Sequence, residues 1–179
     1  MKREDLSAQA EDSYSVQSYD KAPTIDGVII KEIPYFIDDG GLFLEVGRFD
    51  AGMSQWFPDF ELRQVSYSLV LPGAIKAFHL HFQQEDIWFI PPSDRLLVVL
   101  SDERKNSPTS RTAIRFVMGG GKAALLYIPR GVAHGGANLG ATPVSIIYFV
   151  NQQFNREKPD EGRLPWDYLG RDIWHLAQG

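Results

Sequence analysis

The chain of 179 residues contains no cysteine, which excludes a disulfide framework and thiolate chemistry. It has no apolar run near the roughly 20 residues of a membrane-spanning helix, and the N-terminal stretch MKREDLSAQAEDS lacks the apolar core of a signal peptide. An excess of basic charge is also missing: the formal net charge is −5. We therefore expect a cytoplasmic protein that binds neither nucleic acid nor an anionic membrane.

A long helical period is absent as well. Short alternating or apolar runs separated by Gly, Pro and Asp turns predict roughly nine strands and an all-β sandwich or barrel. The polar residues 1–22 are expected to form a mobile N-terminal arm, and residues 23–179 a single domain. Residues 164–178 carry two tryptophans and are expected to contain a short helix.

Histidine is scarce, yet three of the four histidines lie in two short stretches, 73–85 and 129–138. Side chains alternate between the two faces of a strand, so His79 and His81 are expected to share a face. In the second stretch, a Pro-x-Gly turn places His134 near the start of a strand. This arrangement predicts a polar pocket inside a β-barrel.

Two further residues belong to the same pattern. Gln83 follows His81 at the strand spacing of two, and is expected beside it. A turn at residues 84–86 would fold Glu85 back toward the histidines.

The spacings G-x5-H-x-H-x3-E and P-x-G-x2-H-x3-N resemble the two signature motifs of the cupin superfamily. The resemblance implies a double-stranded β-helix, or jelly-roll, barrel. In metal-binding cupins the matching residues hold a divalent ion. Three imidazoles and one carboxylate would suit Mn, Fe, Ni or Zn. Those residues are His79, His81, Glu85 and His134. Alternatively, the same groups line a metal-free polar cavity, as they do in several cupin branches.

A longer resemblance covers residues 27–174, which are similar to the dTDP-4-dehydrorhamnose 3,5-epimerase family, a cupin branch that works without metal. The sequence keeps Leu80-His81-Phe82-Gln83 as it stands in the family. Further matches to family motifs follow in the same order along the chain: Asp38, Gly41, Phe43 and Glu45; Asp102, Arg104, Ser107, Pro108 and Thr109; Ile128, Pro129, Gly131, Ala133, His134 and Gly135; Ile147 and Tyr148; Trp166 and Asp167.

The resemblance implies an isomerase that inverts a carbon beside the 4-keto group of a dTDP-linked 6-deoxyhexose, without a cofactor and as a homodimer. His81 would remove the carbon-bound proton and Tyr148 would return a proton from the opposite side. Taken alone, Tyr148 and Trp88 fit core aromatics better than functional residues. The residues that the resemblance implies for substrate binding are His79, Gln83, Trp88, Arg104 and His134.

The sequence also departs from the family. Where the first family motif has an arginine, this sequence has Gly40, and where the family has Arg-Gly before Leu80, this sequence has Phe78-His79. In the family, a C-terminal segment gives the catalytic histidine its carboxylate partner, and that segment has no match in this sequence. A diphosphate requires nearby cations, and Arg63, Lys76, Arg95, Arg104 and Arg130 are available. Two alternatives therefore stay open: a metal-dependent cupin acting as an oxygenase or isomerase, and a non-catalytic sugar-binding cupin.

Overall fold

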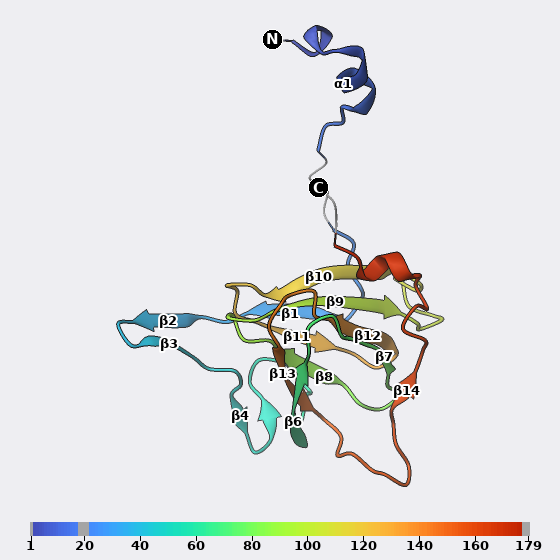
Figure 1. Cartoon of the computed structure of the whole chain (residues 1–179). Helices are drawn as coiled ribbons and strands as arrows, with labels where there is room; N and C mark the ends of the chain where they lie inside the picture. Colours follow the sequence, from blue (N-terminus) through green and yellow to red (C-terminus); the bar gives the residue numbers. More distant parts are fainter. Residues whose placement is uncertain (1, 18–21, 177–179) are drawn as a thin grey trace.

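The computed structural model describes residues 2–17 and 22–176, which form two five-stranded antiparallel sheets. The first sheet has the order β1-β11-β8-β13-β6 and the second has the order β10-β9-β12-β7-β14 (Figure 1). This arrangement confirms the predicted all-β jelly roll. The strands are β1 (Ile29–Glu32), β6 (Gln64–Val70), β7 (Ile75–Leu80), β8 (Asp86–Phe89), β9 (Arg95–Asp102), β10 (Ala113–Gly119), β11 (Ala124–Ile128), β12 (Val132–Ala137), β13 (Val144–Val150) and β14 (Gly162–Arg163).

Two small hairpins complete the strands. The first consists of β2 (Tyr35–Asp38) and β3 (Gly41–Leu44), and it extends away from the barrel (Figure 1). The second consists of β4 (Phe49–Asp50) and β5 (Met53–Ser54). Between the two hairpins, residues 45–48 are not in a strand, and the chain re-enters a strand at Phe49.

Apolar side chains fill the space between the two sheets. Strand alternation sends Trp88 of β8 into this interior together with Val98 and Leu100 of β9. Ile87 and Phe89 point to the other face of the first sheet, where Phe57 and Phe60 from the β4–β5 region cover them. The outer face of the second sheet is covered by the C-terminal segment, mainly through Trp174.

The chain has little helix. The N-terminal region contains the 3-10 turn η1 (Arg3–Asp5) and the short helix α1 (Ala8–Ser13), and neither has a buried residue. The short C-terminal helix appears as η2 (Arg171–Trp174). Residues 1 and 18–21 of the expected arm, and 177–179 at the other end, lie outside the described residues. No helix in the described part is long and apolar enough to cross a membrane.

Candidate active site

A cavity of about 820 Å³ opens between the two sheets. Strands β6, β8 and β13 of the first sheet form one wall, and β7 and β12 of the second sheet form the other. Residues 152–155, 158, 160 and 161, in the loop between β13 and β14, complete the lining. Because of this construction, residues far apart in the sequence meet around one space.

The register of β7 turns His79 into the cavity. Phe78 and Leu80 point to the opposite face, where they pack with Trp174 in the outer core. His79 Nδ1 lies 3.2 Å from the carboxylate of Glu161, and its Nε2 lies 3.5 Å from Arg163. The ring of His79 also stacks on that of His134, its partner across the β7–β12 pair, at a centroid distance of 5.9 Å.

His81 follows the last residue of β7 and is buried. Its Nδ1 donates a hydrogen bond to the main-chain carbonyl of Asp160. The carboxylate of Asp160 in turn accepts the backbone N–H groups of residues 82, 83 and 84, which fixes the turn that carries His81. With Nδ1 protonated, the neutral ring has its lone pair on Nε2, which lies 3.4 Å from the amide nitrogen of Gln84.

His134 is held in the same manner from the other wall. Its Nδ1 donates to the carbonyl of Val132 at 3.0 Å, so the neutral ring has its lone pair on Nε2, whereas the imidazolium carries there a proton that faces Asp86. The turn before β12 depends on Gly131, whose φ is +75° and whose added Cβ would lie 2.5 Å from the Arg104 side chain. The Gly131 N–H donates to the His81 carbonyl at 2.8 Å, which ties the two histidine segments together.

Asp86 is the buried carboxylate of the cavity. It accepts hydrogen bonds from Gln84 Nε2 at 2.8 Å and from the Trp88 indole N–H at 3.1 Å, and one carboxylate oxygen lies 3.5 Å from His134 Nε2. Burial alone would raise the pKa of Asp86, but the contact with His134, the charges that His134 and His81 carry when protonated, and the Gln84 hydrogen bond outweigh burial and lower the pKa to about 2. Asp86 is therefore ionised at neutral pH.

Of the four residues in the alternative metal set, the structure groups His81 and His134 but neither Glu85 nor His79 with them. Glu85 does not face the histidines, because it precedes Asp86 and strand alternation turns it to the other side. It pairs with Arg130 at 3.1 Å and accepts from Asn151 Nδ2 at 3.0 Å. Within the described residues, the ligand atoms that lie within 4.8 Å of one another belong to His81, Asp86 and His134, and His79 is not among them.

Tyr148 reaches the cavity from β13, on the wall opposite β7. Its hydroxyl lies 2.7 Å from Ser68 Oγ on the neighbouring strand β6. Burial, together with the negative charge of Asp86, raises the pKa of Tyr148 although the Ser68 hydrogen bond lowers it. Tyr148 is thus a protonated phenol at neutral pH.

Trp88 and Gln83 also line the cavity, in different ways. Trp88 is buried and meets His134 and Tyr148 edge to face, so its ring forms part of the floor. Gln83 reaches the lining from the turn, because β7 ends at Leu80 and the expected strand alternation does not extend to it.

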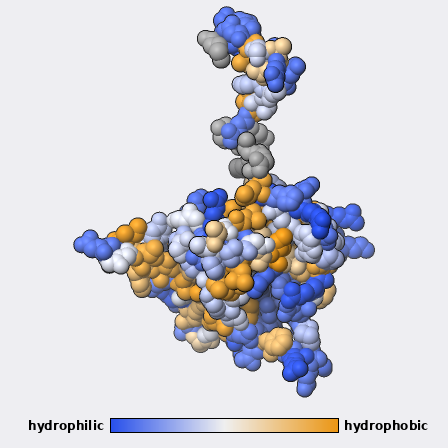
Figure 2. Space-filling view, in the orientation of Figure 1, coloured by the Kyte–Doolittle hydropathy of each residue, from blue (hydrophilic) through white to orange (hydrophobic). Residues whose placement is uncertain are grey.

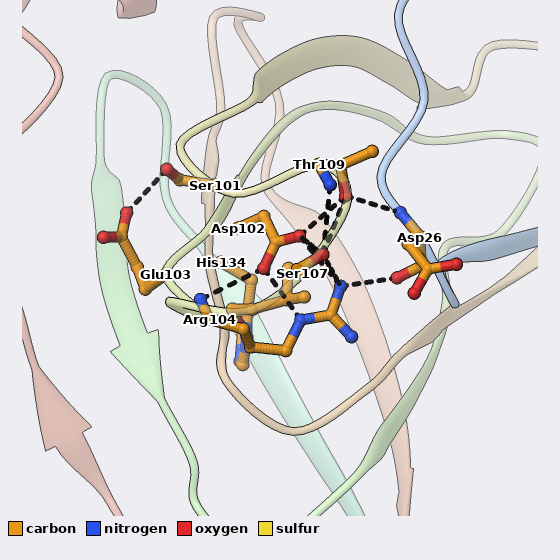
Figure 3. Close-up of polar contacts among 9 residues, drawn as sticks. Asp26, Ser101, Asp102, Glu103, Arg104, Ser107, Thr109 and His134 are labelled. Carbon is orange, nitrogen blue, oxygen red and sulfur yellow. Dashed lines mark hydrogen bonds and ion pairs between the residues drawn. The ribbon is translucent and has the colours of Figure 1, made fainter.

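The position of Arg104 does not support the predicted role in substrate binding, because Arg104 is outside the cavity lining. Its guanidinium donates to the fully buried carboxylate of Asp102 at 2.7 and 2.9 Å and to the carbonyl of Asp26 at 2.6 Å (Figure 3). Ser107 and Thr109 donate to the same carboxylate. The hydrogen bonds hold the pKa of Asp102 far below its usual range although burial opposes them. The D-x-R-x2-S-P-T segment therefore stabilises a loop.

Cations do reach the cavity from other positions. Lys76, Lys158 and Arg163 line it, and of the five basic residues that the sequence offered only Lys76 is among them. Arg163 pairs with Glu161 at 2.6 Å. The two lysine side chains make no ion pair within residues 2–17 and 22–176.

The cavity residues that sequence reasoning missed include Gln84, Asp86 and Asp160. Asp86 could have been found from its spacing to Trp88, since residues i and i+2 of a strand share a face. Asp160 contacts His81 from 79 positions away in the sequence, and no local pattern signals that contact.

The chain is similar to known proteins over most of its length. The sequence profile of the dTDP-4-dehydrorhamnose 3,5-epimerase family matches residues 22–172. The chain belongs to this family. It is accordingly an enzyme of the isomerase class, a sugar epimerase.

Curated relatives and solved structures of this epimerase family resemble most of the chain. The spore coat polysaccharide biosynthesis protein SpsL of Bacillus subtilis is 44% identical over 143 residues, which is 80% of this chain and 91% of SpsL. The probable low-salt glycan biosynthesis epimerase Agl13 of Haloferax volcanii is 30% identical over 145 residues, covering 81% of this chain and 90% of Agl13. The crystal structure of a dTDP sugar isomerase from Desulfovibrio desulfuricans superposes with a TM-score of 0.70 at 26% identity, covering 86% of this chain and 91% of that one.

Proposed function

We propose that this epimerase inverts a carbon beside the keto group of a dTDP-linked 4-keto-6-deoxyhexose, with His81 as the base and Tyr148 as the acid. The observation that carries the proposal is that both side chains line one cavity from opposite walls. A C–H bond beside a carbonyl is acidic enough for removal by an imidazole. Return of a proton to the other face of the carbon then inverts its configuration.

The hydrogen bonds of each group suit its role. The Asp160 carbonyl accepts from His81 Nδ1 and so leaves Nε2 as the basic nitrogen. The carbonyl also favours the imidazolium that forms after proton abstraction, as an acceptor on Nδ1–H does in catalytic triads. Tyr148 enters the reaction protonated, and Ser68 Oγ, at 2.7 Å, can stabilise the phenolate that remains. The chemistry requires no cofactor.

The nucleotide diphosphate would lie against Lys76, Lys158 and Arg163. These three cations line the cavity and compensate for the arginines that the sequence lacks at the family positions. A cavity of about 820 Å³ has room for a sugar and part of its nucleotide.

Hydrogen exchange with solvent tests the base. In deuterated water, the native enzyme should place deuterium at the carbons flanking the carbonyl of a dTDP-4-keto-6-deoxyhexose. His81→Asn should slow this exchange by at least about 100-fold, the usual contribution of a general base. Tyr148→Phe should retain exchange but lose net inversion, because only the donor is removed.

Matched controls separate chemistry from folding. His175→Gln removes an exposed imidazole, and Tyr127→Phe removes a hydroxyl that is not in the cavity lining; both should exchange at the native rate. Native-rate exchange in His81→Asn, or no exchange by the native enzyme with any nucleotide-linked keto sugar, would contradict the proposal.

We further propose that the enzyme works as a homodimer in the cytoplasm. The apolar face of the β2–β3 hairpin supports the dimer: Phe36 and Phe43 are a cross-strand pair and are 65% and 64% exposed. Figure 2 shows hydrophobic side chains on this projection, the part that extends to the left. A second copy of the chain would cover them.

A further inference from the structure

Three buried side chains in the cavity form a ligand set of a different kind from the one that the sequence motif indicated. His81, Asp86 and His134 each offer one ligand atom, and these atoms lie within 4.8 Å of one another. All three residues are buried. Two imidazoles and one carboxylate are a donor set that suits Zn, Fe, Co or Ni rather than Mg or Ca.

Both imidazoles are already arranged as metal ligands are. A metal-bound histidine generally donates its other ring N–H to a carbonyl or carboxylate, which fixes the tautomer and the ring direction. Here His81 Nδ1 donates to the Asp160 carbonyl and His134 Nδ1 donates to the Val132 carbonyl. In the neutral rings each Nε2 therefore carries the lone pair, close to the Asp86 carboxylate, and an ion that binds there displaces any proton on Nε2.

Asp86 is supported in the same way. Gln84 and Trp88 donate to its two carboxylate oxygens at 2.8 and 3.1 Å. The Asp86 oxygen nearest to His134 Nε2 lies 3.5 Å from it, which is long for a hydrogen bond. Two ligands of a tetrahedral ion with bonds of 2.0–2.2 Å lie about 3.3 Å apart, so this spacing already fits an ion between them.

We propose that His81, Asp86 and His134 bind one divalent transition ion inside the cavity. The amide nitrogen of Gln84 lies 3.4 Å from His81 Nε2 and loses this contact when the ion takes that lone pair, while its other N–H still donates to Asp86. Three protein ligands leave open positions for water or for a ligand oxygen. Glu85 and His79, which the sequence motif would include, take no part.

The ion occupies the nitrogen that the proposed function uses as the base. If that function holds, an ion on His81 Nε2 blocks proton abstraction, and Zn²⁺ inhibits the enzyme reversibly. This consequence rests on the proposed function, whereas binding of the ion does not. The two are therefore measured separately.

Direct binding is tested by titrating Zn²⁺ and Co²⁺ into the full chain after dialysis against a chelator. Calorimetry should show one ion per chain. Asp86→Asn and His134→Gln should weaken binding by at least about 100-fold, since loss of an outer partner alone costs 10–100-fold. Mg²⁺ should not compete, because imidazole is a poor ligand for it.

Two matched variants distinguish this set from the motif set. His79→Gln and Glu85→Gln remove the members that lie outside the cluster, and both should bind Zn²⁺ with native affinity. If Glu85→Gln abolishes binding while Asp86→Asn retains it, the proposed ligand set is overturned. The same follows if the native chain binds no Zn²⁺ at millimolar concentration.

A spectroscopic measurement on the native chain tests the ligand set without relying on variants, which could fail to fold. In the native Co²⁺ form, proton NMR should show two hyperfine-shifted signals that exchange with D₂O, one from each Nδ1–H that is bonded to a carbonyl. Absence of both signals with Co²⁺ bound would place the ion elsewhere and overturn the proposal. Inhibition of deuterium exchange by Zn²⁺ and its reversal by a chelator are then measured as the separate, functional arm.

Discussion

His79 and His81 are two residues apart, yet the structure gives them different surroundings. His81 has a single carbonyl partner on Nδ1, whereas His79 lies between Glu161 and Arg163 and stacks on His134. Burial lowers the pKa of His79, and the nearby His134 and Arg163 lower it further, against the effect of Glu161, to about 4. His79 is therefore neutral in the folded enzyme at pH values where an exposed histidine is charged.

This shift predicts a loss of stability in mild acid. Between pH 6.5 and about 4 the unfolded chain binds a proton at residue 79 and the folded chain does not, so the free energy of unfolding falls as pH is lowered through this window. His79→Gln should flatten that part of the curve, as measured by urea denaturation at pH 7, 5.5 and 4.5. His175→Gln controls for the loss of one imidazole. Equal slopes for native and His79→Gln would refute the shift.

From the sequence, we could predict which residues line the cavity better than we could predict the contacts that those residues make. Strand alternation placed His79 in the cavity, and the family resemblance named His81 and Tyr148, which both line it. The same approach named Arg104, which proves to be bound to Asp102. A motif records that a residue type recurs, but the partner of a charged group depends on contacts between distant segments.

At the scale of elements, the long strands were predictable because alternation over five or more residues is a strong pattern. The two-residue strands β4, β5 and β14 were not, because two residues cannot show a period. The start of β8 determines which carboxylate faces the cavity. The strand begins at Asp86, which faces the cavity, and Glu85 therefore points away from it. One position of register changed the candidate metal ligand.

Arg104, in the loop between β9 and β10, allows a structural role to be distinguished by experiment from a role in substrate binding. Arg104→Ala leaves the fully buried Asp102 carboxylate without its cation and should destabilise the fold by about 3 kcal/mol, the lower range for a broken buried pair, because Ser107 and Thr109 still donate to it. Arg130→Ala breaks the more exposed pair with Glu85 and should cost less than about 1 kcal/mol. Urea denaturation measures both, and equal losses would contradict this assignment.

At the scale of the whole molecule, the two sheets end in different edge strands. Strand β6 ends the first sheet and exposes Val65 and Leu69 on its outer face, and the β2–β3 hairpin exposes apolar side chains nearby in the chain. A two-stranded hairpin is marginally stable alone, and an apolar edge strand tends to pair with another chain. These features favour a partner of the same sequence.

The predicted homodimer can be tested at that edge. The native enzyme should sediment at twice the 20.2 kDa mass of the chain. Leu69→Lys places a charge on the apolar outer face of β6 and should shift the protein toward the monomer, because an unpaired charge is costly to bury.

Val117→Lys is the matched control for this substitution. Val117 is also an exposed apolar residue, 45% accessible, on β10, which ends the other sheet. Because no apolar hairpin accompanies that edge in the part of the chain that the structure describes, Val117→Lys should leave the mass unchanged. A native enzyme that sediments at 20.2 kDa, or equal dissociation in the two variants, would show that the β6 edge does not form the dimer. Dissociation of Leu69→Lys alone would assign the interface to β6.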